Sequence, residues 1–472
     1  MKSIPRLFVL NRVIAIVFTI GRVAAVPLAT FVTANFVCAA DSPNILVIVS
    51  DDQGYADAGF QGSKDIPTPQ LDRLAQAGLR CTSGYVTHPY CSPSRAGLLT
   101  GRYQSRFGHE RNPRYLPENH DEGLPLSETL FPEYLAKAGY VTGWIGKWHL
   151  GAAPEFHPEK RGFMETFGFI GGGHHYQNWK PGGAEYLVPI LRNGRPEAVK
   201  EHLTLAFGHE AGAFVTRHKD QPWFLYLAFN APHSPQEPTA ERLARFAGIQ
   251  NKGRRAYAAQ ISLMDDAIGE TLNALRATGQ EKRTIVFFFS DNGGPHGGEA
   301  SNAPLRGWKN DLYEGGIHVP FLVSWPGHLP SGKDYSEMVS SLDVASTALA
   351  VAGIQTPTNK PLDGVNLLPY LAGDRMGVPH EKLFWRENIF VATALRAGDD
   401  KFIRIGAKPG ELYNLKLDLG EKSNLAVLDA KKTARLQSEV DGWMKQMSKH
   451  LLFLGLRDIP EQSWPGEAGE EK

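Results

Sequence analysis

The stretches "NILVIVSDDQG" (residues 44–54) and "TIVFFFSDNGG" (residues 284–294) share one pattern, an unbroken apolar run that ends in a pair of polar, acid-containing residues. Apolar runs without alternation predict strands that are buried on both faces, as in a parallel sheet. The same pattern recurs in "GYVTGWIGKWHLG" (residues 139–151) and "WFLYLAFNAPHSP" (residues 223–235). We therefore predict four buried parallel strands with polar residues at their carboxyl ends.

Helical patterns separate these strands. They are "TPQLDRLAQAGL" (residues 68–79), "SETLFPEYLAKAG" (residues 127–139) and "AYAAQISLMDDAIGETLNALRATG" (residues 256–279). In the last, Ile261, Met264, Ile268, Leu272 and Leu275 follow helical spacing. Strands that alternate with helices predict an α/β fold, a large and mostly parallel sheet covered by helices on both faces. Ligands of such sheets bind outside the carboxyl ends of the strands, so the polar ends should meet at one rim.

The chain changes character after about residue 376. "KLFWREN", "VATALRAG" and "KFIRIG" resemble short antiparallel strands, and a terminal helix carries Leu436, Val440, Trp443 and Met447 on one face. We predict a catalytic α/β domain over residues 41–375 and a smaller antiparallel sheet with a helix over residues 376–472.

The first 40 residues have the features of a secretory signal. Lys2 and Arg6 precede an apolar run, and small residues lead to a polar break after Ala40. Arg22 interrupts the apolar region, which argues against stable membrane insertion. We expect residues 1–40 to be removed and the mature protein to be periplasmic or extracellular; an uncleaved N-terminal anchor is the alternative.

Charge and cysteine content restrict the function further. Lys plus Arg and Asp plus Glu both number 50 in 472 residues, which gives no indication of a nucleic-acid partner. Removal of the signal would leave two cysteines, Cys81 and Cys91. Cys91 could then form one bridge with Cys81, be a buried thiol, or take part in chemistry.

Carboxylates and an amide follow two of the predicted strands, as Asp51-Asp52 and Asp291-Asn292. These hard oxygen ligands suit Ca²⁺ or Mg²⁺ better than zinc. Each pair alone could equally cap a turn or a helix. Their shared position at strand ends favours a metal site.

Cations and histidines occupy the other strand ends and nearby motifs. Lys147, Lys309 and Arg95 could stabilise negative charge on an oxyacid ester, although a lone lysine is usually a solvated surface group. His233 could protonate a leaving group or serve only as a turn residue. A helix beginning near Pro93 would place Cys91 at a helix N-terminus, which attracts anions. The same position would also activate a plain cysteine thiolate as a nucleophile, so a cysteine hydrolase is an alternative.

The stretch from Cys91 to Arg95, "CSPSR", followed by "LLTGR", resembles the C-x-P-S-R signature of the type I, formylglycine-dependent sulfatases of the alkaline-phosphatase-like superfamily. The similarity continues, in the order of the family, through "DDQGYADAG", "PTPQLDRLAQAGLR", "GYVTGWIGKWHLG", "APHSP", "SDNGG", "PLRGWKNDLYEGG" and "ELYNLKLDLGEKSNLA". The resemblance implies a sulfatase. In that family a maturation enzyme oxidises the motif cysteine, here Cys91, to formylglycine, and Arg95 would hold it. One hydroxyl of the hydrated aldehyde attacks sulfur and releases the alcohol, and the other then expels sulfate.

The resemblance assigns further roles to single residues. One Ca²⁺ per chain would be bound by Asp51, Asp52, Asp291, Asn292 and the modified Cys91. Lys147 and Lys309 match the sulfate-binding lysines. His149 matches the residue that assists the formylglycine hydroxyls, and His233 the residue that contacts sulfate and protonates the leaving oxygen. His318 stands where the family commonly has arginine, and we expect this to affect local support rather than the reaction.

Sulfatases with such a leader resemble those that desulfate polysaccharides, so we expect a sulfated carbohydrate, an algal galactan or a glycosaminoglycan fragment attacked at a chain end. Two loop segments could line the mouth of the site, through His109, Arg111, Arg114, His174, His175 and Tyr176. Each could instead be an ordinary loop residue. The alternatives are a phosphonate monoester or phosphodiester hydrolase of the same superfamily, and a catalytically silent protein that binds sulfated glycans.

Overall fold

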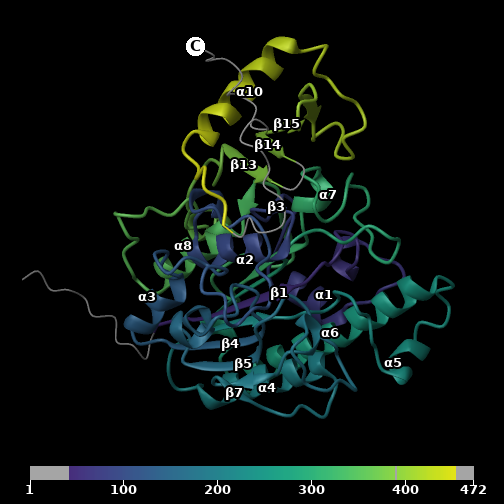
Figure 1. Cartoon of the computed structure of the whole chain (residues 1–472), viewed down its shortest axis with the longest axis vertical. Helices are drawn as coiled ribbons and strands as arrows, with labels where there is room; N and C mark the ends of the chain where they lie inside the picture. The colour runs from purple at the N-terminus through teal and green to yellow at the C-terminus, as the bar shows by residue number, and fades with distance from the viewer. Residues whose placement is uncertain (1–41, 389–390, 453–472) are drawn as a thin grey trace, which may run out of the picture. The chain divides into compact units, whose positions relative to one another are not determined.

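A computed structural model of the chain describes residues 42–388 and 391–452, so the expected signal at residues 1–40 lies outside the described residues. Its main feature is a ten-stranded sheet (Figure 1). From edge to edge the strands are β11 (Lys333–Tyr335), β2 (Leu79–Cys81), β10 (Phe321–Ser324), β9 (Thr284–Ser290), β1 (Asn44–Ser50), β8 (Trp223–Ala228), β4 (Val141–Lys147), β5 (Glu165–Phe169), β6 (Leu191–Arg192) and β7 (Arg195–Pro196).

The centre of this sheet is parallel. β9, β1, β8, β4 and β5 pair in parallel, whereas β10 is antiparallel to β9. The four strands predicted from the sequence are β1, β4, β8 and β9, so both the elements and their direction are confirmed. Because their carboxyl ends point the same way, the polar clusters that follow them share one edge of the sheet.

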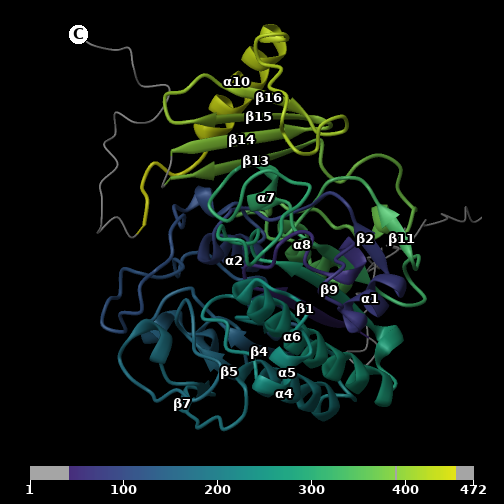
Figure 2. The ribbon, with the colours of Figure 1, turned by 90° about the vertical axis from the view of Figure 1, so that its right-hand side faces the viewer.

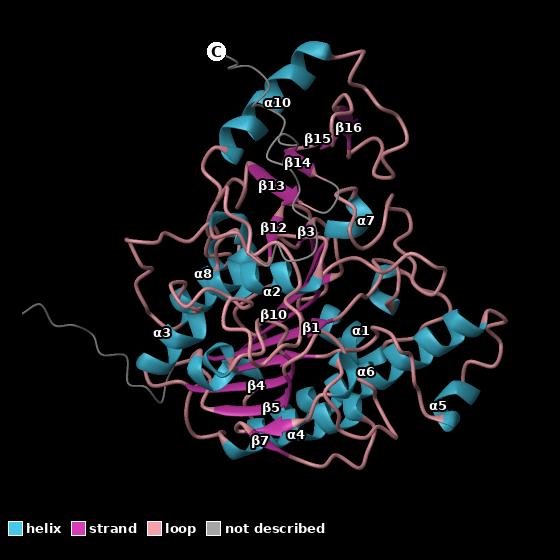
Figure 3. Ribbon diagram, viewed as in Figure 1, coloured by secondary structure: helices cyan, strands magenta, loops and turns pink. Residues whose placement is uncertain are grey.

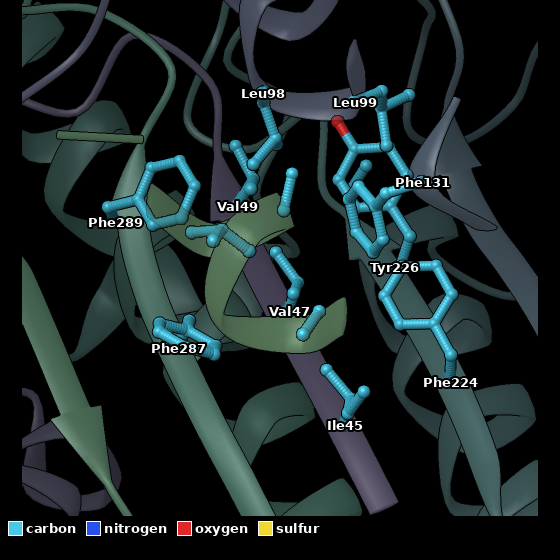
Figure 4. Packing of buried hydrophobic residues seen from close by; sticks show 14 of the residues in the cluster. Ile45, Val47, Val49, Leu98, Leu99, Phe131, Phe224, Tyr226, Phe287 and Phe289 are labelled. Atoms are coloured by element: carbon cyan, nitrogen blue, oxygen red, sulfur yellow. The ribbon is translucent and has the colours of Figure 1, made fainter. Parts of the chain in front are cut away.

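Helices cover both faces, as predicted (Figures 2 and 3). One face is covered by α2 (Cys91–Thr100), α3 (Phe131–Lys137) and α8 (Leu342–Val351), and the other by α1 (Pro69–Gln76), α4 (Leu203–Arg217) and α6 (Lys252–Ala277). Alternate residues of β1 face opposite layers. Val47 and Val49 pack toward Leu98 of α2 (Figure 4), whereas Leu46 and Ile48 join the core under α4 and α6. This double burial explains the unbroken apolar run of β1.

The C-terminal region contains a second, antiparallel sheet. It consists of β13 (Lys382–Glu387), β14 (Ala392–Ala397), β15 (Asp400–Ile405) and β16 (Glu411–Asn414). Leu436 and Val440 of α10 (Ala430–Met444) pack on it, and Met447 is buried just beyond the helix. Other short elements are β3 (Gly84–Tyr85), β12 (Val339–Ser340), α5 (Ala240–Ala244), α7 (Glu314–Ile317) and α9 (Leu368–Leu371), together with several single turns of 3-10 helix. The domain boundary at residue 375 stays a prediction.

A buried charge cluster connects this sheet to α7 and to Thr82, directly after β2. Lys401 of β15 donates to Glu314 Oε1 of α7 at 2.7 Å, and its Nζ lies 3.0 Å from Glu421 Oε1. His318 joins the cluster, with Nδ1 2.9 Å from Glu314 Oε2 and Nε2 2.9 Å from the carbonyl oxygen of Thr82. His318 therefore supports the segment that follows Lys309. Among the described residues, no helix combines the length and apolar character needed to cross a membrane.

Candidate active site

Sheet register brings the two polar pairs together. The last residues of β1 and β9 are register partners, so Asp51-Asp52 and Asp291-Asn292 leave the sheet side by side. The amide N–H of Asp52 donates to Asp291 Oδ1 at 3.3 Å, and Asn292 Nδ2 donates to Asp52 Oδ1 at 2.7 Å. All four residues are buried. The expectation that these residues meet at one rim is confirmed.

Cys91 lies beside these carboxylates as the first residue of α2. Its Sγ is 3.4 Å from Asp51 Oδ1 and 3.9 Å from Asp52 Oδ1. Cys81 and Cys91 are both free thiols, so the bridge that the sequence left open is not formed. Burial, opposed by the nearby lysines, raises the pKa of the Cys91 thiol well above its ordinary value. Burial therefore favours the neutral thiol of Cys91 over its thiolate.

Each carboxylate of the cluster has a different cation as its nearest partner. Arg95 Nε donates to Asp291 Oδ2 at 2.9 Å, Lys147 Nζ donates to Asp51 Oδ2 at 2.7 Å, and Lys309 Nζ lies 2.8 Å from both carboxylate oxygens of Asp52. Burial disfavours the charged carboxylate of Asp51, but Lys147 and other neighbouring cations outweigh it and hold its pKa well below the usual range. The formal charges of these buried pairs cancel.

The donor set at the cluster fits a hard divalent cation. Potential ligand atoms of Asp51, Asp52, Cys91 and Asp291 lie within 4.8 Å of one another. Asn292 Oδ1 is buried and has no hydrogen-bond partner among the described residues, which is costly unless a further ligand satisfies it. Carboxylate and amide oxygens are the ligands that Ca²⁺ and Mg²⁺ prefer. Because the protein charges already balance, a bound divalent ion would leave the site positive.

The two predicted histidines lie at the same rim. His149 adopts a left-handed backbone conformation, with φ at 61°, and its carbonyl oxygen accepts from Ser92 Oγ at 2.6 Å. Burial, reinforced by the charge of Lys147, lowers the pKa of His149 well below its usual value. His233 Nε2 is 3.5 Å from Asp52 Oδ2, and its Nδ1 is 2.7 Å from the carbonyl oxygen of Ser234. Burial also lowers the pKa of His233, although nearby carboxylates oppose that effect.

Three of the six residues predicted to line the mouth are buried, so that prediction is wrong for them. His109 is 0% exposed, with Nε2 2.7 Å from Ser92 Oγ. His174 is 1% exposed, and its ring nitrogens face backbone carbonyl oxygens. Tyr176 is 0% exposed, and its hydroxyl lies 2.8 Å from the carbonyl oxygen of His233. All three side chains contact polar partners inside the protein, so they stabilise the segments that carry the site residues.

The other three residues reach the surface. Arg114 pairs with Glu122, and His175 Nδ1 lies 2.8 Å from Glu237 Oε1. Arg111 is half-buried. These contacts use Nε and Nη2 of Arg114 and Nδ1 of His175, and substrate binding by these residues remains a prediction.

Several tyrosines at the site were not predicted. The Tyr257 hydroxyl donates to the carbonyl oxygen of Asp52 at 3.1 Å, and the Tyr226 hydroxyl is 3.4 Å from Arg95 Nη1. The ring centroid of Tyr186 is 6.3 Å from that of His233. Tyr226 lies inside a strand pattern and Tyr257 inside a helix pattern, so the sequence offers no local signal that separates them from core residues.

Comparisons with known proteins agree with this geometry. The sulfatase family profile matches residues 43–354, and the profile named "N-sulphoglucosamine sulphohydrolase, C-terminal" matches residues 307–450. The chain is 38% identical over 379 residues to the N-acetylgalactosamine-6-sulfatase of Mus musculus, covering 75% of this chain and 70% of that protein. It is 35% identical over 437 residues to the arylsulfatase A of Homo sapiens, covering 81% and 83%.

One solved structure is similar to this chain over most of the length of both proteins. The crystal structure of Ps i-CgsB in complex with k-i-k-neocarrahexaose has a TM-score of 0.83 and 36% sequence identity, and the match covers 86% of this chain and 94% of that one. The fold, the cluster at the rim and the family match point to the same conclusion. The chain belongs to the sulfatase family and is a sulfatase.

Proposed function

We propose that this sulfatase hydrolyses sulfate monoesters on a carbohydrate, with formylglycine formed from Cys91 as nucleophile and one bound Ca²⁺. The observation that carries the proposal is the buried contact of Cys91 Sγ with Asp51 Oδ1 at 3.4 Å, inside a ring of carboxylates and cations. The carbohydrate is favoured by two similar proteins, an N-acetylgalactosamine-6-sulfatase and a structure that contains k-i-k-neocarrahexaose.

The proposed Ca²⁺ ligands are Asp51, Asp52, Asp291, Asn292 and position 91. When bound, Ca²⁺ supplies positive charge to the sulfate oxygens and formylglycine supplies the attacking hydroxyl. Arg95 is fully buried and donates to Asp291, so it orients one carboxylate of the set and holds the start of α2 against the sheet. Burial of these side chains lowers the local dielectric constant, which strengthens each of these interactions.

The remaining residues bind sulfate and move protons. Lys147 and Lys309 pair with Asp51 and Asp52 here. When a metal shares those carboxylates, the ammonium groups can donate to sulfate oxygens. The lowered pKa of His149 favours its neutral form, which accepts a proton from a hydroxyl.

His233 is the proposed acid for the leaving oxygen. Its Nδ1 lies 2.7 Å from a carbonyl oxygen, so Nδ1 carries a proton and Nε2 is the atom that gains and loses the second one. The Nε2 atom faces Asp52 at 3.5 Å, which directs it into the site. An anionic ester bound nearby would stabilise the imidazolium that donates this proton.

The test uses protein coexpressed with a formylglycine-generating enzyme. Released sulfate is measured with N-acetylgalactosamine 6-sulfate and k-i-k-neocarrahexaose, and a phosphodiester is assayed in parallel. Cys91→Ala should abolish sulfate release, whereas Cys81→Ala, at the other buried free thiol, should retain it. An unmodified Cys91 peptide mass in fully active protein, or faster turnover of the phosphodiester, would refute the proposal. Carbohydrate binding without hydrolysis by matured protein would favour the silent binding protein.

We also propose that residues 1–40 are an export signal and that residues 376–472 form a separate C-terminal subdomain. The N-terminal sequence of protein recovered outside the cytoplasm tests the first point, with Asp41 expected as the first residue. Recovery of an intact N-terminus in the membrane fraction would instead indicate an anchor.

A further inference from the structure

Tyr186 is a half-buried residue at the rim, in a short turn of helix over Glu185–Leu187. Its ring centroid is 6.3 Å from that of His233, and the two ring planes are inclined by 35°. Among the residues that the structure describes, no group is hydrogen-bonded to the Tyr186 hydroxyl. The ring therefore lies beside the proposed acid with its polar end available.

The glycine run at residues 171–173 places Tyr186 close to the other rim histidine as well. A Cβ atom on Gly172 would lie 2.5 Å from His149 Nε2, and one on Gly173 would lie 2.4 Å from Cε1 of Tyr186. Consecutive glycines thus pack directly against the two side chains. The carboxylate of Glu185 accepts from the amide N–H of Gly172, which ties the Tyr186 turn to the same loop.

Charges of the cluster act on the Tyr186 hydroxyl. Burial raises the pKa of Tyr186, and the charges of Lys147, Asp51 and Lys309 influence it in opposite directions. Tyr90, directly before Cys91, is similarly placed, because its ring centroid is 5.3 Å from Lys309 Nζ. Aromatic side chains therefore adjoin the buried ion cluster both near His233 and near Lys309.

We propose that Tyr186 binds the sugar ring that carries the scissile sulfate and positions its leaving oxygen beside His233. This inference rests on the proposed function. With the sulfate among the buried cations, the leaving oxygen must lie near His233, so the sugar must extend past the side chain that adjoins it. A pyranose has apolar C–H faces and hydroxyl edges, and tyrosine matches both with a flat ring and one polar end.

The test separates the sugar from the sulfate. The substrate is N-acetylgalactosamine 6-sulfate or k-i-k-neocarrahexaose, depending on which of the two the wild type hydrolyses faster. KM for this substrate is measured for the wild type, Tyr186→Ala, Tyr186→Leu and Tyr186→Phe. Product sugar is quantified by chromatography, so that inorganic sulfate can be added as an inhibitor. Tyr134→Ala, at a half-buried tyrosine on α3, is the matched control.

Loss of the ring should raise KM about tenfold, equivalent to about 1.4 kcal/mol, a typical cost of truncating an important aromatic contact. Tyr186→Leu should resemble Tyr186→Ala, which keeps the test valid if the alanine variant fails to fold. Tyr186→Phe should stay within about threefold of wild type, and the inhibition constant of inorganic sulfate should not change in any variant.

Two results would overturn the inference and leave the proposed function intact. One is an active wild type whose KM is unchanged by Tyr186→Ala and Tyr186→Leu. The other is a parallel weakening of inorganic sulfate and carbohydrate, which would indicate general damage to the site. If the matured wild type hydrolyses neither carbohydrate, the proposed function fails first and the inference falls with it.

Discussion

Replacement of Lys401 tests how the C-terminal sheet supports the active-site segment. Its ammonium group is fully buried, 2.7 Å from Glu314 Oε1 and 3.0 Å from Glu421 Oε1. Lys401→Met keeps most of the apolar stem but leaves two buried carboxylates without their shared cation. Removal of one partner from a buried ion pair costs about 3–5 kcal/mol, because an uncompensated charge remains. We expect a loss of this size in the free energy of unfolding at about pH 8.

The loss should shrink in acid. Burial raises the pKa of Glu421 to about 7, which favours a proton on this carboxyl. Lys401 lowers this pKa, so its removal raises the pKa of Glu421 further, and in acid a proton on Glu421 removes the carboxylate charge that the variant can no longer pair. The variant should therefore lie closer to wild type at about pH 5.5. The dependence on pH distinguishes loss of charge pairing from loss of packing, which would be the same at both pH values.

Urea-induced unfolding followed by tryptophan fluorescence and by circular dichroism measures this effect, and coincident transitions establish that one process is observed. Lys416→Met replaces an exposed lysine in the same C-terminal region and should change the free energy of unfolding by less than about 1 kcal/mol. A loss below about 1 kcal/mol for Lys401→Met at pH 8, or equal losses at the two pH values, would refute the electrostatic explanation.

Three further predictions concern the metal, the pH dependence of stability and the glycine run. Chelation should abolish activity and lower the thermal midpoint of unfolding, and added Ca²⁺ should restore both. Asn292→Ala should raise the Ca²⁺ concentration that restores half of the activity. Full activity in demonstrably metal-free protein would contradict this prediction. Because the pKa of Glu421 is about 7 in the folded protein and its ordinary value is 4.5, the folded state binds this proton more tightly. The free energy of unfolding should therefore fall as pH rises from about 4.5 to 7, and Glu421→Gln should flatten that fall in urea titrations. Gly172→Ala places a Cβ atom 2.5 Å from His149 Nε2, which must displace the imidazole ring. The kcat value should therefore fall about tenfold to a hundredfold, while the circular dichroism spectrum stays unchanged. A normal kcat would show that this displacement of His149 does not affect the reaction.

The central strands and the rim could be predicted because their signals are local. Between their first and last residues β1 and β9 are entirely apolar, because both faces of the sheet are covered, and this burial makes the polar residues after each strand conspicuous. Parallel direction then places Asp51 and Asp291 at one edge without knowledge of the strand order. Direct pairing of the two strands is a further fact, which only the structure provides.

Loop residues were harder to predict because exposure depends on the whole fold. His109, His174 and Tyr176 have the composition of a polar pocket wall, yet each is buried against a partner from another segment. Tyr186 follows Glu185 in a polar loop and has no neighbouring motif. The packing of its ring against Gly173 marks it, and that contact is not visible in the sequence.

Two site residues have a strained backbone, and the residues that restrain them could not be predicted from the sequence. Asp52 and His149 have φ values of 65° and 61°, in a left-handed region that costs a non-glycine residue about 1–3 kcal/mol when the surroundings impose it. Tyr257 holds the carbonyl oxygen of Asp52 from α6, and Ser92 holds that of His149 from α2. Each hydrogen bond comes from an element that is distant in sequence. The sequence motif therefore contains the strained residue, Asp52 or His149, but not the residue that restrains it. Substitutions at such supports should therefore impair the site while every motif residue remains in place.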